Sequence, residues 1–145
     1  INVKYGLTSQ QIVIHNCAVA DKMGKVVFSR YENNNGEGSK ITDYENEGNC
    51  KVVCLDEYLK EPYTFLKADI ESFEYRMLQG ARRGIIEYKP KLAICIYHSS
   101  IDLYSIPMLI KELVPDYKLA IRHHANDLTG TVLYAWREEE LTIEG

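Results

Sequence analysis

Short runs of β-branched and apolar residues alternate along this chain with segments in which apolar residues recur at helical spacing. Runs such as Gln-Ile-Val-Ile-His-Asn-Cys-Ala-Val and Lys-Leu-Ala-Ile-Cys-Ile-Tyr are typical of buried strands. The strands predicted in this way span residues 11–19, 25–29, 50–55, 63–69, 91–97, 117–123 and 131–137. The run at 91–97 is almost wholly apolar, which is typical of a strand covered by helices on both faces.

Helices are expected between these strands where apolar residues recur at helical spacing or where a Gly or Pro ends the segment. The expected helical segments are the tail at residues 1–7 and residues 56–59, 72–79, 81–88 and a helix ending near Val114. Asp56 is a suitable N-cap for the short helix, and Pro107 suits the start of the last one. The stretch 31–49 is rich in Asn, Gly, Glu and Ser and predicts a long exposed loop, while the acidic tail 138–145 predicts a frayed end.

This order of elements predicts one α/β domain over residues 1–145. Helices that alternate with strands in the middle of the chain favour a mostly parallel sheet. The last two strands are separated by a short turn at residues 126–130 and are expected to pair antiparallel.

Composition narrows the classes of function. Seventeen Lys and Arg against 21 Asp and Glu give a net charge of −4 without a basic cluster, which argues against nucleic-acid binding. Apolar runs stay well short of the ~18–20 residues that span a bilayer, so no membrane span is expected. Four cysteines without a metal-ligand spacing are interpreted as reduced thiols, which favours the cytoplasm. The chain starts at Ile1 and is interpreted as a fragment.

Candidate chemistry gathers where the predicted strands end, which is where open parallel sheets bind ligands. Asp69 ends the central strand, and a carboxylate there can accept a cofactor amine, hold a cation or act as a base; it can also simply cap the next helix. Glu71 follows two residues later, and its place in the first turn of a helix is explained by the helix dipole. His98 follows the next strand and is a general base, a metal ligand or a structural residue.

Other histidines carry weaker signals. At most one of His123 and His124 can face a site, because adjacent residues of a strand point to opposite faces. His15 lies inside a predicted strand and is interpreted as structural. Asp69, Glu71 and His98 offer oxygen and imidazole ligands for a divalent cation, but no spacing demands one, and no metal is predicted. The chain lacks the G-x-S-x-G, G-x-x-x-x-G-K and G-x-G-x-x-G motifs.

The central motif resembles a known signature. Residues 65–74 read Phe-Leu-Lys-Ala-Asp-Ile-Glu-Ser-Phe-Glu, and Leu78 and Gly80-Ala81 follow, as in FkbM-family methyltransferases. Segments 16–21, 55–59, 90–94, 96–98, 119–124 and 131–135 are similar to the family as well, so the resemblance runs from about residue 12 to residue 135. Ser72 stands where the family usually has glycine, a departure that is expected to matter little for the fold.

The resemblance implies an S-adenosylmethionine-dependent methyltransferase with a Rossmann-like sheet that acts on a hydroxyl of a sugar or another small metabolite. By position, Cys17 and Ala18 would line the adenine with help from Asp21. Asp69 would lie beside the methionine part or the acceptor, with Glu71 in the same catalytic group, and His98 would be the base.

In that fold a glycine-rich loop and two strands precede the segment seen here. The resemblance therefore implies a sheet with a gap and two unpaired edges, and a chain that alone binds S-adenosylmethionine poorly and is inactive. Two alternatives remain open at this point: a metal-assisted methyltransferase that uses Asp69, Glu71 and His98, and a non-catalytic Rossmann-like binding module. The acceptor and the oligomeric state are left open.

Overall fold

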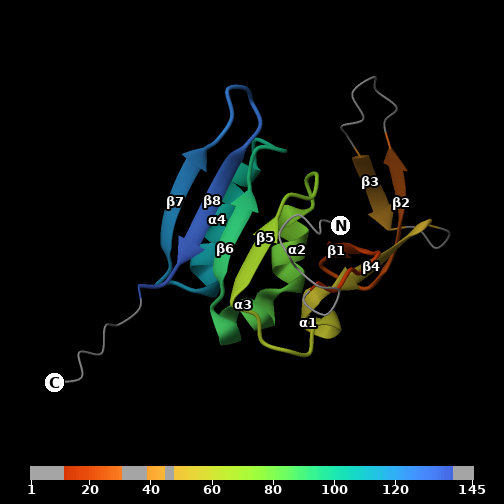
Figure 1. Ribbon diagram of the computed structural model, residues 1–145, viewed down its shortest axis with the longest axis horizontal. Coiled ribbons are helices and arrows are strands. Elements are labelled where there is room, and N and C mark those ends of the chain that lie inside the picture. Colours follow the sequence, from red (N-terminus) through yellow and green to blue (C-terminus); the bar gives the residue numbers. More distant parts are fainter. Residues whose placement is uncertain (1–11, 31–38, 45–47, 139–145) are drawn as a thin grey trace.

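A computed structural model describes residues 12–30, 39–44 and 48–138 (Figure 1). Its strands are β1 (Ala18–Ala20), β2 (Gly24–Arg30), β3 (Ser39–Tyr44), β4 (Cys50–Cys54), β5 (Phe65–Ala68), β6 (Lys91–Cys95), β7 (Lys118–His123) and β8 (Thr131–Trp136). Its helices are α1 (Leu55–Tyr58), α2 (Glu74–Gly80), α3 (Arg82–Tyr88) and α4 (Asp102–Leu113). The expected α/β class is confirmed by this order.

The strands form two sheets, with the orders β1-β4-β2-β3 and β5-β6-β8-β7. Within the described strands, only β1 with β4 and β5 with β6 pair in parallel. The remaining neighbours are antiparallel, including the final pair β7–β8 that the sequence predicted. The expectation of a mostly parallel sheet is therefore wrong, because hairpin connections dominate both ends of the chain.

The expectation of a loop over residues 31–49 is wrong in its second half. Residues 39–44 form β3, which pairs antiparallel with β2 in a register that joins Phe28 to Ile41 and Arg30 to Ser39. The segment Ser-Lys-Ile-Thr-Asp-Tyr holds two β-branched residues at its centre, a strand signal that the surrounding Asn and Gly obscured.

Three local predictions also need correction. The strand expected at 11–19 is reduced to Ala18–Ala20, although its parallel pairing with β4 gives it a defined place. Pro107 lies inside α4 and not at its start, because the helix begins at Asp102. The N-cap of α1 is Cys54, without a side-chain bond. The expected helix tail at residues 1–7 and nearly all of the acidic tail lie outside the described residues.

Asp56 caps a different helix from the one expected. Its carboxylate accepts hydrogen bonds from the backbone N–H groups of Arg83, at 2.7 Å, and Gly84, at 2.9 Å. These groups belong to the first turn of α3, which has no partner for them within its own backbone. The carboxylate therefore ties α1 to α3 across a long sequence separation.

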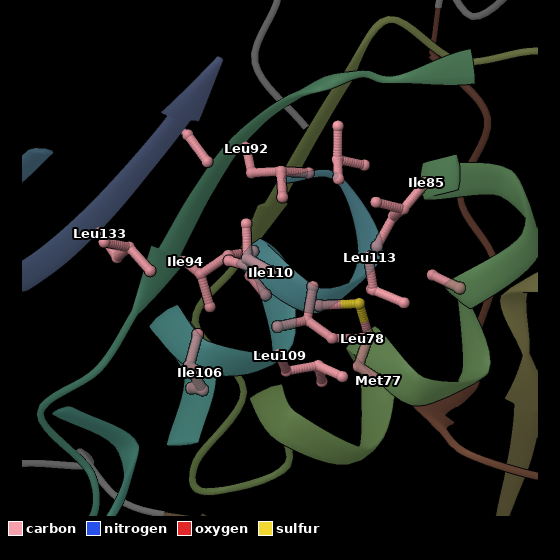
Figure 2. Close-up of a cluster of buried hydrophobic side chains, with 14 of the residues drawn as sticks. Met77, Leu78, Ile85, Leu92, Ile94, Ile106, Leu109, Ile110, Leu113 and Leu133 are labelled. Atoms are coloured by element: carbon pink, nitrogen blue, oxygen red, sulfur yellow. The ribbon is translucent and has the colours of Figure 1, made fainter. Parts of the chain in front are cut away.

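The main core lies between the β5-β6-β8-β7 sheet and helices α2, α3 and α4, which lie behind that sheet in Figure 1. Figure 2 shows Leu92 and Ile94 of β6 and Leu133 of β8 meeting Ile106 and Ile110 of α4. In Figure 1 the described helices lie on one side of β6, so the expected cover by helices on both faces is not found in the described residues, although Ala93 and Cys95 are buried as well as Leu92 and Ile94.

Helix α2 also contacts the other sheet. A Cβ atom placed on Gly80 would lie 2.1 Å from the carbonyl oxygen of Ala20, so only glycine allows β1 to lie this close to the end of the helix. At the start of α2, Phe73 packs with Ala20, Val26 and Val52 in a smaller core cluster. Helix α2 therefore joins the two sheets.

Candidate functional site

Asp69 and His98 meet at one edge of the second sheet, as the sequence predicted. Asp69 directly follows β5, and Tyr97 and His98 come shortly after β6. The two strands are parallel neighbours, and Ala68 at the end of β5 is in register with Ile94, the last residue but one of β6. The Oδ1 atom of Asp69 lies 3.4 Å from Nε2 of His98. The two side chains therefore border a single site.

Glu74 is the site residue that sequence analysis missed. Its side chain is completely buried, and its Oε1 atom lies 2.9 Å from Nδ1 of His98. The same oxygen accepts a hydrogen bond of 2.7 Å from the backbone N–H of Ile70. Glu74 stands in the first turn of α2, where the helix dipole by itself favours an acid. The apolar neighbours Phe73 and Met77 were the signal that this turn faces inward.

Asp69 and Glu71 form the exposed rim of the site. Their side chains are 42% and 50% exposed, and Oε2 of Glu71 lies 3.8 Å from Nε2 of His98. The Tyr97 hydroxyl donates a 2.9 Å hydrogen bond to Oδ1 of Asp69. Burial, followed by this bond and the charge of Asp69, raises the pKa of Tyr97 well above its usual range, so the tyrosine stays a donor that fixes the carboxylate.

The loop between β5 and α2 has a left-handed backbone. Glu71 has φ 55° and Ser72 has φ 74°, a region in which a side chain costs energy and glycine does not. The family's glycine at the Ser72 position therefore has a conformational reason, and the expectation that serine matters little there needs correction. This turn directs Glu71 toward His98.

A pocket of about 610 Å³ opens beside His98. It is lined by Ser72, Tyr75, Arg76, His98, Ser99, Ile101, Asp102 and Ser105, and it lies between the start of α2 and the start of α4. Asp102 is 5% exposed, and burial, together with the nearby charge of Glu74, raises the pKa of its carboxyl. The pocket thus places hydroxyl and charged groups around one face of the histidine.

His98 itself is buried and poorly satisfied. Its side chain is 7% exposed, and neither ring nitrogen has a hydrogen-bond partner of adequate geometry among the described residues. Asp69, Glu74 and His98 each offer one ligand atom, and these atoms all lie within 4.8 Å of one another. The arrangement can accept a proton at the imidazole or hold a cation between the three side chains.

The remaining histidines lie elsewhere. His123 contacts the hydroxyl of Thr131 at 2.9 Å, and His124 contacts the hydroxyl of Tyr134 at 2.9 Å, both on the exposed surface. Strand β7 is three positions from β5, about 14 Å at the usual strand spacing, so His123 does not reach Asp69. His15 contacts the Tyr58 hydroxyl at 2.6 Å, which agrees with a structural role.

The predicted adenine-binding residues lie at and next to β1, where Asp21 approaches the far end of α2 and Ala18 packs against the cluster that contains Phe73. Asp21 lies beside Gly80, the last residue of α2, whereas Glu74 is the first residue of that helix. The two ends are about 9 Å apart at the normal helical rise. Contact of Cys17, Ala18 and Asp21 with a cofactor stays a prediction.

Residues 1–119 match the family model of the methyltransferase FkbM domain. The chain therefore belongs to the FkbM methyltransferase family, as its motifs indicated. A crystal structure of methyltransferase FkbM from Methylobacillus flagellatus KT is similar, with a TM-score of 0.70 and 31% sequence identity over 92% of this chain. The match spans 31% of the length of that protein. No curated protein matched this chain. Among the described helices, none has both the length and the apolar character that crossing a bilayer requires.

Proposed function

We propose that this chain supplies the acceptor side of an S-adenosylmethionine-dependent methyltransferase site, in which a hydroxyl of a small acceptor is methylated. The observation that supports this most is the position of His98, buried between Glu74 and Asp69 beside an open pocket, in a chain of the FkbM family. A sugar or another small hydroxylated metabolite is the proposed acceptor class.

In this proposal His98 is the general base. The contact with Glu74 at Nδ1 holds the ring in place and stabilises the positive charge that it gains, since a carboxylate is the natural partner of an imidazolium. Nε2 would take the proton of the acceptor hydroxyl as the oxygen forms its bond to the methyl carbon and the carbon–sulfur bond of the cofactor breaks, leaving S-adenosylhomocysteine. The hydrogen bond from the Ile70 N–H keeps Glu74 in place during this step.

The exposed rim fits the charge of the proposed cofactor. S-adenosylmethionine supplies a methyl group that its positively charged sulfur already activates, so alignment provides most of the rate. Asp69 and Glu71 are exposed carboxylates beside His98 and would attract the cationic methionine part. Asp69 is additionally fixed by Tyr97. Cys17, Ala18 and Asp21 are the residues proposed for the adenosine part.

The pocket beside His98 is the proposed acceptor site. Ser72, Ser99 and Ser105 line it with hydroxyl groups, and Tyr75 provides an aromatic surface. Such a lining suits an acceptor with several hydroxyls and a weakly polar face. The four free thiols agree with a reducing compartment, so the cytoplasm remains the proposed location.

The test is formation of S-adenosylhomocysteine by the complete product of this gene, measured with a panel of hydroxylated acceptors. His98→Ala should reduce turnover about 100-fold or more, the usual contribution of a general base. Asp69→Asn should also reduce turnover, while His124→Ala, which removes an exposed histidine outside the site, should leave it unchanged. Equal turnover of the His98→Ala and His124→Ala variants would refute the assignment.

A further inference from the structure

Carboxyl side chains gather around His98. Glu74, Asp69 and Glu71 approach its ring nitrogens to 2.9, 3.4 and 3.8 Å. Three carboxyl groups therefore surround a single imidazole. Glu74 is fully buried, and a buried carboxylate needs a partner of opposite charge to offset the loss of water.

A second observation points to a missing ligand. The His98 side chain is more than nine-tenths buried, and its nitrogens face carboxylates without forming hydrogen bonds of adequate geometry. The Oε2 atom of Glu74 is also buried and lacks a hydrogen-bond partner among the described residues. Native proteins rarely leave buried polar groups unsatisfied, and a bound ion can satisfy several of them at once.

We propose that Asp69, Glu74 and His98 bind a divalent first-row transition-metal ion. One ligand atom from each lies within 4.8 Å of the other two, so bonds of about 2.0–2.2 Å need side-chain shifts of at most roughly 0.7 Å. Two carboxylates and one imidazole suit ions such as Mn²⁺, which accept both oxygen and nitrogen ligands. In this ligand set Glu74 replaces Glu71, which the sequence offered as a ligand and which lies at the exposed rim.

Existing hydrogen bonds support this ligand set. The Ile70 N–H donates to Glu74, and the Tyr97 hydroxyl donates to Asp69. A carboxylate has about four acceptor positions, so each of these side chains can keep its bond and still bind an ion. Such donors behind metal ligands fix the ligand orientation and tune the affinity.

The ion has a consequence for the proposed methyl transfer, and only this consequence rests on that function. A neutral imidazole has only one nitrogen with a free lone pair. An ion bound to that nitrogen of His98 therefore leaves no base for the proton of the acceptor. Mn²⁺ should therefore lower turnover, and a chelator should restore it. The binding itself is independent of any activity.

The test is a titration of the chelator-treated 145-residue chain with Mn²⁺, in which free Mn²⁺ is followed by electron paramagnetic resonance. One ion per chain should bind saturably. His98→Ala and Glu74→Gln should each weaken binding at least about tenfold. Asp69→Asn should also weaken binding, and it carries little risk to folding because the side chain is exposed. Circular dichroism checks the folding of each variant.

Matched controls are Glu87→Gln on the exposed surface of α3 and His124→Ala, which should both bind as the unaltered chain does. The absence of saturable binding at millimolar Mn²⁺ would overturn the proposal. Equal affinity of Asp69→Asn and Glu87→Gln would overturn it as well. Either result leaves methyl transfer untouched, because no cofactor or acceptor is present in the titration.

Discussion

Replacing Glu74 by glutamine tests whether a charged contact holds the site together. The carboxylate is fully buried, accepts a hydrogen bond from Ile70 and lies 2.9 Å from the His98 ring. Hydrogen bonds to charged groups contribute about 1.5–3 kcal/mol and neutral ones about 0.5–1.5 kcal/mol. The amide keeps the shape and one acceptor but loses the charge. The free energy of unfolding should therefore fall by about 1–2 kcal/mol.

The assay is urea unfolding of the metal-free chain, followed by circular dichroism, with Glu87→Gln as the matched exposed control. The control should change the free energy of unfolding by less than about 0.5 kcal/mol. A double-mutant cycle with His98→Ala should give a coupling energy of about 1 kcal/mol, since the two side chains touch. Equal stability of Glu74→Gln and Glu87→Gln, or a coupling energy of zero, would refute the reasoning.

Three further substitutions test local features of the fold. Ser72→Gly should raise the free energy of unfolding by about 0.5–1 kcal/mol, measured by urea unfolding, because it removes the strain of a serine in the left-handed region. Ser105→Gly inside α4 is the control and should lower the free energy of unfolding by about 0.5 kcal/mol. A change of the same sign in both variants would contradict this account. Asp56→Ala should lower the free energy of unfolding by about 1 kcal/mol, because the first turn of α3 loses its cap. Glu57→Ala should lower the free energy of unfolding by less than about 0.5 kcal/mol. Equal losses in the two variants would argue against the cap. Burial raises the pKa of Tyr117 to about 12, above the ordinary value of 10, so its stabilisation is complete below pH 10 and is lost as pH rises through 12. Urea unfolding of Tyr117→Phe should show a shallower decline in that range, and an unchanged decline would contradict the burial effect.

The sequence predicted the meeting of Asp69 and His98 because the ends of neighbouring parallel strands share an edge, and that geometry follows from element order alone. It did not predict Glu74, since an acid in the first turn of a helix already has an adequate explanation in the helix dipole. The inward direction of that turn depends on Phe73 packing against the first sheet, which is a tertiary contact.

Strand pairing was beyond the local pattern for the same reason. Ile41 and Thr42 are the residues that indicate a strand at β3. The pairing of β3 with β2, however, depends on contacts between two separate segments of the chain. The glycine preference at Ser72 became clear only from its positive φ. Local residue types thus identified most elements, while pairing partners and burial decided the site.

The most direct test of the central claim is a crystal structure of the complete gene product with S-adenosylhomocysteine. The proposal predicts that the sulfur faces the pocket that His98 borders, with the amino group near Asp69 or Glu71. A product molecule bound in a different part of the protein, with His98 facing away from its sulfur, would contradict the proposed methyl-transfer site.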